Sequence, residues 1–388
     1  MKENLFHCGL AVFVFYAVAV FHGDLSHAAA SKEPYRVGAV LCITGFGGAF
    51  GTAQKEAMEA LVDKVDKSGG INGASVEFFA EDDQSQPTNA NIAVSKLIKD
   101  RKVHAVIGST LTNSCMAIIP TIEKSEVPNL SLGAGYEIAR PTKKWVFQNG
   151  PTDEGLAPEM LRFAAQKVKA KKVAIFFSSD ASGQMGGQKL RELAPKYGLQ
   201  ITALEEFGPA DTNMVPQLTK INRTNPELLF VYGTAQGAGI IAKNAKQLAM
   251  KIPIVGSHGI PMPRFLQVAG DAAEGWILFT QKATIGPKIS PSDPWRTRYD
   301  DFVKTITAKY PNSACDTFAA NGYDALSIVL EVLKKAGSDK DRIRTALEVS
   351  SHKGVNGNYK YSPSDHAGFD ASEEIPVTVK NGEFVFYQ

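Results

Sequence analysis

Residues 44–51 read Thr44-Gly45-Phe46-Gly47-Gly48-Ala49-Phe50-Gly51, and this stretch decides how the first half of the chain folds. Before it, residues 37–43 are apolar throughout, which predicts a buried strand. After it, apolar residues recur at helical spacing over residues 52–68, which predicts a helix. Open α/β sheets bind ligands at such strand-to-helix turns, outside the carboxyl ends of their strands. The stretch therefore predicts an α/β fold with a binding site at this turn.

The alternation of strand and helix continues beyond this first unit. Alternating elements predict parallel sheets with helices on both faces. A second set of about five strands, which begins near residue 173, follows the first set, and an irregular segment at residues 283–293 precedes helices that no longer alternate with strands. We expect those helices to complete the first lobe. The fold class is therefore α/β, with two doubly wound parallel-sheet lobes joined by a multi-strand hinge. The remaining strands expected in the first set are residues 76–80, 105–108, 128–132 and 145–148.

The first thirty residues differ from the rest. Lys2 precedes an apolar run from Leu5 to Phe21, and small residues follow at 28–30. This pattern predicts a secretory signal peptide over residues 1–30 and a mature protein in the periplasm. A membrane anchor is the alternative, because the run is close to the shortest span of a bilayer.

Length, charge and cysteine content limit the class of protein further. A chain of 388 residues is long enough for two domains, and a net charge of +2 without a basic stripe argues against a nucleic-acid partner. Beyond the predicted signal, the cysteines are Cys42, Cys115 and Cys315. An odd number allows at most one disulfide, and buried free thiols are the favoured interpretation.

The glycine-rich stretch comes near a dinucleotide-binding fingerprint. It contains Gly45, Gly47 and Gly51, but Phe50 stands where the third glycine of the fingerprint should fall. A single imperfect match is weak support for a nucleotide. The glycines are better interpreted as a tight turn that lets the backbone approach a ligand, and no cofactor is predicted.

The chain offers few candidates for catalytic residues. Ser257 and His258 are adjacent after a predicted strand, but consecutive side chains diverge and rarely act as nucleophile and base. Asp82 and Asp83 are interpreted as a solvated pair that opens a loop. Zinc motifs, paired Cys-x-x-Cys and the P-loop do not occur. The sequence therefore predicts no enzyme and no metal site.

Fragments spread from Tyr35 to Gln388 carry a family resemblance. In this order and spacing, the chain resembles the type I periplasmic solute-binding proteins of branched-chain amino-acid ABC transporters, the leucine/isoleucine/valine-binding family. The resemblance implies a clamshell fold that binds one ligand between two lobes. The fragments are residues 44–51, Ser68-Gly69-Gly70-Ile71-Asn72-Gly73, Glu81-Asp82-Asp83-Gln84-Ser85-Gln86-Pro87, Val106-Ile107-Gly108-Ser109, Gly150-Pro151-Thr152-Asp153, Ala273-Glu274-Gly275 and Asn321-Gly322-Tyr323-Asp324-Ala325.

The clamshell also implies a division of the chain. We expect residues 34–153 and 283–360 to form lobe 1, and residues 154–282 and 361–388 to form lobe 2. Near the end of the chain, Lys380-Asn381-Gly382-Glu383 lies between apolar runs and predicts a hairpin. The resemblance implies a monomer that delivers a small carboxylate to membrane permease subunits.

In the first lobe, the resemblance implies a site that holds a carboxylate through hydroxyls and backbone N–H groups. Phe50 matches the position of an aromatic lid. The hydroxyl donors are Thr112 with its neighbours Ser109 and Thr110. A backbone strip at Gly133, Ala134 and Gly135 follows, where the family often has a hydroxyl in place of Gly135, and Tyr136 could add a phenol.

In the second lobe, the resemblance implies contacts to an ammonium, and the chain departs from the family there. Ser182 stands where an aromatic residue is common, Ala235 where a tyrosine is frequent, and His258 where an acid usually stands. Asp153, near the crossing between the lobes, is the nearby acid. An ammonium buried without an acceptor is costly.

These departures predict a ligand that is not a simple α-amino acid. A small organic acid without an amine, aromatic or otherwise, fits better, since a protonated His258 would attract an anion. The alternative is that His258 only packs or binds water and that another residue holds the amine. A second alternative for the whole protein is a sensor that presents ligand occupancy to a receptor.

Overall fold

The computed structural model describes residues 32–388. The predicted signal peptide, residues 1–30, lies outside the described residues. Within residues 32–388, no helix combines the length and the apolar character that crossing a bilayer requires.

The first lobe is built on a parallel sheet of five strands in the order β2-β1-β3-β4-β5. The chain reverses direction across this sheet at β1, between β2 and β3, so the loops after β1 and β3 flank a switch point where ligands bind in such sheets. The strands are β1 (Tyr35–Leu41), β2 (Val76–Asp82), β3 (Ala105–Gly108), β4 (Asn129–Ser131) and β5 (Val146–Gln148).

The second lobe repeats this order. Its sheet runs β7-β6-β8-β9-β10-β13-β14, with the switch point at β6 and β8. The last two strands are antiparallel, which the alternating pattern did not predict, and the hairpin expected at residues 380–383 joins them. The strands are β6 (Lys172–Ser178), β7 (Gln200–Phe207), β8 (Leu228–Tyr232), β9 (Ile254–Gly256), β10 (Ile277–Thr280), β13 (Ile375–Lys380) and β14 (Glu383–Phe386).

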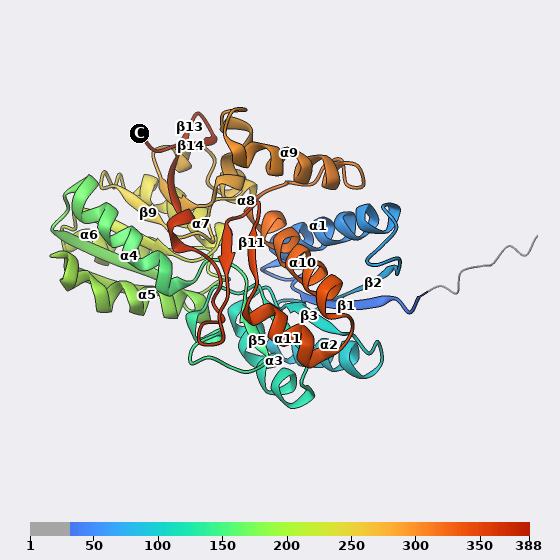
Figure 1. Cartoon of the computed structure of the whole chain (residues 1–388). Coiled ribbons are helices and arrows are strands. Elements are labelled where there is room, and N and C mark those ends of the chain that lie inside the picture. The colour runs from blue at the N-terminus through green and yellow to red at the C-terminus, as the bar shows by residue number, and fades with distance from the viewer. Residues whose placement is uncertain (1–31) are drawn as a thin grey trace, which may run out of the picture. The chain divides into compact units, whose positions relative to one another are not determined.

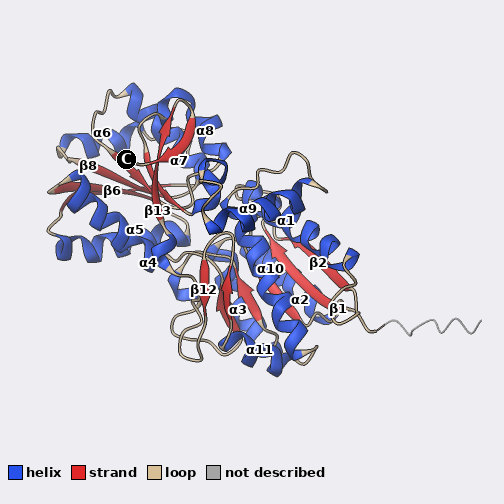
Figure 2. Ribbon diagram, turned by 45° about the horizontal axis from the view of Figure 1, so that its top comes forward, coloured by secondary structure: helices blue, strands red, loops and turns tan. Residues whose placement is uncertain are grey.

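Helices cover both sheets, as the α/β class predicts (Figure 1). Late in the chain, α10 packs along α1, and α11 packs on α10 (Figure 2). The exact boundaries of the two lobes stay a prediction. The helices are α1 (Gly48–Lys67), α2 (Pro87–Lys99), α3 (Thr112–Ser125), α4 (Asp153–Phe163), α5 (Ala181–Leu193), α6 (Val215–Arg223), α7 (Ala235–Gln247), α8 (Pro263–Ala269), α9 (Pro294–Thr307), α10 (Thr317–Ala336) and α11 (Lys340–Glu348).

Short elements complete the chain. A small two-stranded sheet stands apart from the two large ones, and single turns of other helix types lie between the main elements. These are β11 (Ser351–Lys353), β12 (Asn358–Lys360), the π-helical η2 (Ala164–Val168), and the 3₁₀ turns η1 (Tyr136–Ile138), η3 (Ala194–Tyr197), η4 (Gly270–Ala273), η5 (Lys282–Lys288) and η6 (Ala371–Glu373).

The glycine-rich stretch is partly helical, which corrects the sequence interpretation. The helix was expected from residue 52, but α1 begins at Gly48, so Phe50 lies in its first turn. Gly45 has φ +85°, and a Cβ on Gly51 would lie 2.3 Å from the carbonyl oxygen of Cys42. The stretch therefore needs glycine for a tight turn and for the close packing of α1 on β1.

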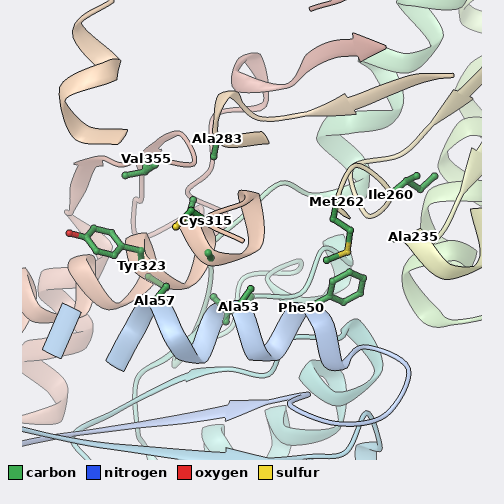
Figure 3. Close-up of a cluster of buried hydrophobic side chains, with 14 of the residues drawn as sticks. Phe50, Ala53, Ala57, Ala235, Ile260, Met262, Ala283, Cys315, Tyr323 and Val355 are labelled. Carbon is green, nitrogen blue, oxygen red and sulfur yellow. The ribbon is translucent and has the colours of Figure 1, made fainter. Parts of the chain in front are cut away.

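The core extends from α1 toward the second lobe. Figure 3 shows Ala53 and Ala57 on α1 beneath Tyr323 of α10 and Cys315, which precedes α10, while Phe50 lies next to Met262. Cys42, Cys115 and Cys315 are buried free thiols in the described part of the chain. Burial raises the pKa of Cys42 and of Cys115 to about 12 and that of Cys315 to about 11.

Candidate ligand-binding site

A cavity of about 90 Å³ lies where the loops after β3, β6, β8, β9 and β10 meet the first turns of α3, α5 and α10. Both switch points therefore contribute to one site. The lining residues are Phe46, Phe50, Thr110, Leu111, Thr112, Asn113, Leu132, Ala134, Pro151, Asp180, Ser182, Gly183, Tyr232, Gly233, Thr234, Ser257, His258, Gly259, Gln281, Thr317, Phe318, Asn321 and Asn356.

Acidic residues fix the loops of the first lobe. Asp82 accepts hydrogen bonds from the backbone N–H groups of Ile43 and Thr44 and from the Thr44 hydroxyl at 2.7 Å. Asp83 is buried and accepts the Ser109 hydroxyl at 2.5 Å. Burial raises the pKa of Asp83. The pair that the sequence suggested to be solvated thus positions the loops that carry the site.

Thr112 offers a hydroxyl proton to the cavity. Its oxygen accepts the Gly135 N–H at 3.1 Å, so its own proton is available for a ligand. The Thr110 hydroxyl instead donates to Gln54 Oε1 at 2.7 Å. Of the two threonines, Thr112 is therefore the better donor.

Five helices begin at the cavity wall, and they differ in capping. The first turns of α5 and α10 are capped by Asp180 and Asp316, whose carboxylates accept backbone N–H groups. The first turns of α3 and α7 have no side-chain cap. That of α1 has none either, but its Gly48 and Phe50 N–H groups are bonded to the carbonyls of Gly45 and Gly47. Helix N-termini carry partial positive charge and unpaired N–H groups. The uncapped starts of α3 and α7, one in each lobe, can therefore receive an anionic group.

Asp153 lies behind the second-lobe wall. Its Oδ1 accepts the Tyr232 hydroxyl at 2.5 Å and the Ser182 hydroxyl at 3.2 Å. Burial raises the pKa of Asp153 well above its usual value. Tyr232 and Ser182 line the cavity and separate Asp153 from it. Asp153 therefore holds two wall residues in place instead of facing a ligand.

His258 is an uncharged wall residue. Burial lowers the pKa of its imidazole to about 4, and Nδ1 lies 3.8 Å from Oε1 of the buried Glu374. Burial also raises the pKa of Glu374 to about 8. Both groups are therefore neutral at pH 7. This changes the interpretation of His258, which the sequence suggested could attract an anion as a cation.

Aromatic rings form the apolar part of the wall. Phe50 stacks on Phe318 with ring centroids 4.3 Å apart, which joins the first turns of α1 and α10. Phe50 is buried, whereas Phe46 in the same loop is 44% exposed. Both rings line the cavity, the Phe50 ring as a buried part of the wall and the Phe46 ring partly at the surface.

A hydrogen bond joins the two lobes beside the cavity. Asn113 Oδ1, in the first turn of α3, accepts the backbone N–H of Ala181 at the start of α5 at 3.0 Å. Since α3 follows a strand of the first sheet and α5 a strand of the second, this bond holds the two walls together.

Six of the twelve residues predicted from the sequence line the cavity. They come from the first turn of α1, the loops after β3, β4 and β9, and the first turns of α3 and α5. They are Phe50, Thr110, Thr112, Ala134, Ser182 and His258.

The other six do not line it, for reasons visible in the structure. The Ser109 side chain turns to Asp83, Asp153 is screened, and the Gly135 N–H is bonded to Thr112. Gly133 packs against Cys115, where a Cβ would lie 2.7 Å from its sulfur. Tyr136 lies beneath the Lys189 ammonium, and Ala235 lines a neighbouring surface pocket.

The sequence did not predict several of the lining residues. Tyr232 closes a buried strand, Gln281 follows β10, and Thr317 and Phe318 begin α10. The rule that ligands bind at the carboxyl ends of strands could have found Tyr232 and Gln281. Helix α10 reaches the cavity from far along the chain, and no local sequence pattern reveals that it packs there.

Other chemistry has little support in the described residues. Within residues 32–388, no group of three or more His, Cys, Asp or Glu side chains is placed to hold a metal ion. The Ser257 hydroxyl is bonded to the backbone of Gly233, at 3.1 Å from its N–H, and so is not paired with His258.

Known proteins resemble this chain over most of its length. A leucine-, isoleucine-, valine-, threonine- and alanine-binding protein of Pseudomonas aeruginosa is 23% identical over 348 residues, which cover 89% of this chain and 87% of that protein. An extracellular ligand-binding receptor from Rhodopseudomonas palustris has a crystal structure that matches with a TM-score of 0.86 at 26% identity, and covers 92% of this chain and 100% of its own.

A further crystal structure shares the fold. It is a branched-chain amino acid transporter substrate binding protein from Streptococcus pneumoniae in complex with isoleucine, with a TM-score of 0.81 and 24% identity over 91% of this chain and 98% of its own. The profile of one family, described as periplasmic binding protein, matches residues 34–372. With two repeated parallel sheets, one cavity at both switch points and a family match over most of its length, the chain belongs to the periplasmic binding protein family.

Proposed function

We propose that this chain captures a small organic acid between its two lobes and delivers it to the permease of an ABC importer in the periplasm. The chain is a solute-binding protein and not an enzyme. Its cavity of about 90 Å³ exceeds several times the roughly 10–15 Å³ that one water needs, which suits a small molecule. The relatives named for branched-chain amino acids support a role in import.

The uncapped helix starts support a carboxylate as the recognised group. At α3, the first-turn N–H groups and the Thr112 hydroxyl can all donate to one anion. At α7, a second uncapped start adds partial positive charge from the other lobe. Lysine and arginine are not among the lining residues, so these dipoles supply the attraction.

The positions of the protein's carboxyl groups favour a ligand without an amine. Asp180 is the one acidic residue among the lining residues, and its oxygens already accept the Gly183 N–H at 3.0 Å and the Ser178 hydroxyl at 2.5 Å. Asp153 and Glu374 lie behind the wall. A desolvated ammonium needs a partner, and Asp180 alone could serve.

Closure of the two lobes is the proposed mechanism. A ligand that touches both walls favours the closed state over the open one by the difference in its affinity for the two. The bond from Asn113 to Ala181 forms only when the walls meet, so it adds to that preference.

Calorimetric titration with matched ligands tests this function. We expect isocaproate and hydrocinnamate to bind at least about tenfold more tightly than leucine and phenylalanine, which differ from them by the amine. Thr112→Val should lower the affinity for every carboxylate ligand by about threefold to tenfold, since it removes one hydrogen bond.

A variant at the single lining acid separates the two ligand classes. Asp180→Asn should reduce the affinity for amino acids and leave that for the acids without an amine much less affected. Tight binding of leucine that Asp180→Asn abolishes, with no response to isocaproate, would contradict an amine-free ligand.

A further inference from the structure

The cavity wall contains polar atoms that nothing in the protein satisfies. His258 Nδ1, Gln281 Nε2 and Asn356 Nδ2 are buried atoms of lining residues, and none of them has a hydrogen-bond partner. The three side chains are more than nine-tenths buried, with exposures of 8%, 1% and 2%. Buried polar groups are nearly always bonded in native proteins. These atoms therefore indicate a missing partner inside the cavity.

The unsatisfied atoms gather from distant segments. His258 follows β9, Gln281 follows β10, and Asn356 lies between β11 and β12. Glu374, just before β13, lies behind His258, and neither of its carboxyl oxygens has a partner. We call these four residues the polar wall.

Thr317 cannot by itself satisfy both amides of the polar wall. Its hydroxyl lies within bonding reach of Gln281 Oε1 and, at 2.6 Å, of Asn356 Oδ1. One hydroxyl proton can serve only one of these oxygens. If either amide rotates, its NH₂ group can donate to Thr317, but the NH₂ group of the other amide stays unpaired. Through Thr317 alone, one amide donor is left for another partner, which is a ligand or the nearby Glu374 and Tyr359, whose pKa values already reflect hydrogen bonding from Gln281 and Asn356.

The polar wall is also uncharged. Burial lowers the pKa of His258 to about 4 and raises that of Glu374 to about 8, so neither carries a charge at pH 7. A second carboxylate or an ammonium on the ligand would find no opposite charge there. A group that both donates and accepts hydrogen bonds without charge suits these atoms best.

We propose that the ligand carries, besides its carboxylate, a hydroxyl group that bonds to Gln281, Asn356 and His258. The inference rests on the proposed function and specifies its substrate class as a hydroxylated organic acid. The hydroxyl oxygen accepts an amide N–H, and its proton goes to an imidazole nitrogen or an amide oxygen. Sites built to bond a hydroxyl discriminate strongly against analogues that lack it.

Calorimetric titration of the full chain with six matched acids tests the proposal. Benzoate, para-methylbenzoate and para-hydroxybenzoate share a carboxylate, and the last two have substituents of similar size. Meta-hydroxybenzoate and an aliphatic pair, butyrate and gamma-hydroxybutyrate, extend the comparison to other positions and lengths. At least one hydroxylated acid should bind about tenfold or more tightly than its unhydroxylated partners.

Variants then assign the preference to the polar wall. Gln281→Met should reduce the hydroxyl preference, which is the ratio of the affinities for a hydroxylated acid and its unhydroxylated partner, at least about fivefold. Gln217→Met, on α6 and outside the cavity, is the matched control and should keep the preference. If Gln281→Met does not fold, the comparison of hydroxylated and unhydroxylated acids on the natural chain still tests whether a hydroxyl is recognised.

The outcomes separate the two proposals. If carboxylates bind and every hydroxylated acid equals its partner, the polar wall holds only water, and this inference is wrong while the proposed function stands. If no carboxylate binds, both are wrong. If the preference appears and survives Gln281→Met, the hydroxyl is recognised elsewhere, which overturns the assignment to these residues.

Discussion

At the scale of single residues, three acids of this protein, Asp82, Asp83 and Asp153, work from behind the cavity wall. Asp82 fixes the first loop, Asp83 holds Ser109, and Asp153 holds Tyr232 and Ser182. Each carboxylate is bonded to hydroxyl groups, which explains why acids near a binding site need not touch the ligand. The consequences can be measured as stability, apart from any ligand.

Tyr232→Phe tests the bond behind the wall. The change removes the hydroxyl that donates to Asp153 at 2.5 Å and leaves a buried carboxyl with fewer partners. We expect the free energy of unfolding to fall by about 1–3 kcal/mol, measured by urea denaturation. Tyr387→Phe is the control, because it removes a hydroxyl from a ring that packs on Phe163 at the half-exposed end of the chain. Equal effects of both changes would contradict the assigned bond.

Glu374→Gln tests the neutral state of the polar wall. Burial raises the pKa of Glu374 from 4.5 to about 8, so between these values the folded state keeps a proton that the unfolded state has lost. The stability that this proton provides is complete below pH 4.5 and is lost as the pH rises toward 8. The loss has a slope of up to about 1.4 kcal/mol per pH unit.

The glutamine variant cannot lose that proton. Its free energy of unfolding, measured by urea denaturation across the same pH range, should therefore fall less steeply than that of the natural chain. His258 and the other buried acids remain in both proteins, so their contributions cancel in the difference. Parallel curves for the two proteins would show that Glu374 is ionised in the folded state.

At the scale of elements, the starts of helices determine the site. The glycine-rich stretch brings α1 so close to β1 that Phe50 in its first turn reaches Phe318 of α10. On the other side, Gly135 allows a close approach, since a Cβ there would lie 2.3 Å from Thr112 Cγ2 and 2.8 Å from Met185 Sδ. Met185 belongs to α5, so Gly135 lets the two lobes meet.

Gly135→Ser tests this contact. The family resemblance suggests a hydroxyl at this position, yet the structure leaves no room for its Cβ. We expect the serine to displace Thr112 and α5 and to weaken ligand binding by about threefold to tenfold, the value of one lost hydrogen bond. Titration calorimetry with the tightest carboxylate of the panel measures the change.

A second substitution serves as the control for this prediction. Thr112→Ser removes the Cγ2 that collides and keeps the hydroxyl, so the double variant Thr112→Ser, Gly135→Ser should recover part of the affinity. If Gly135→Ser binds more tightly than the natural chain, the family pattern outweighs the steric argument.

At the scale of the whole molecule, the sequence predicts the architecture better than the site. Alternating apolar runs and helical patterns are local signals, so the two parallel sheets and the hairpin at residues 380–383 follow from them. The lining residues Thr317 and Gln281 come from distant segments, and their meeting depends on packing between lobes. The side-chain direction of Ser109 depends on a partner, Asp83, which no spacing rule reveals.

The bond between the lobes gives a prediction at this scale. Asn113→Ala removes the acceptor for the Ala181 N–H and should shift the ligand-free population toward the open state. Affinity should fall by about threefold to tenfold, mainly through faster dissociation, measured by stopped-flow or surface plasmon resonance. Asn91→Ala, which breaks a bond to Thr121 inside the first lobe, is the control. An unchanged dissociation rate would contradict a role for Asn113 in closure.

The three buried thiols have a consequence for following these motions. Cys42 donates to the Gly47 carbonyl and Cys115 to the Ser109 carbonyl, so both lie directly beneath the loops of the site, whereas Cys315 precedes α10. None can be alkylated until its surroundings open, so the rate of alkylation measures the rate of local opening. A ligand that rigidifies the site should slow the modification of Cys42 and Cys115 together. The natural chain thus contains its own chemical reporters, and its local opening can be measured without introducing a cysteine by mutation.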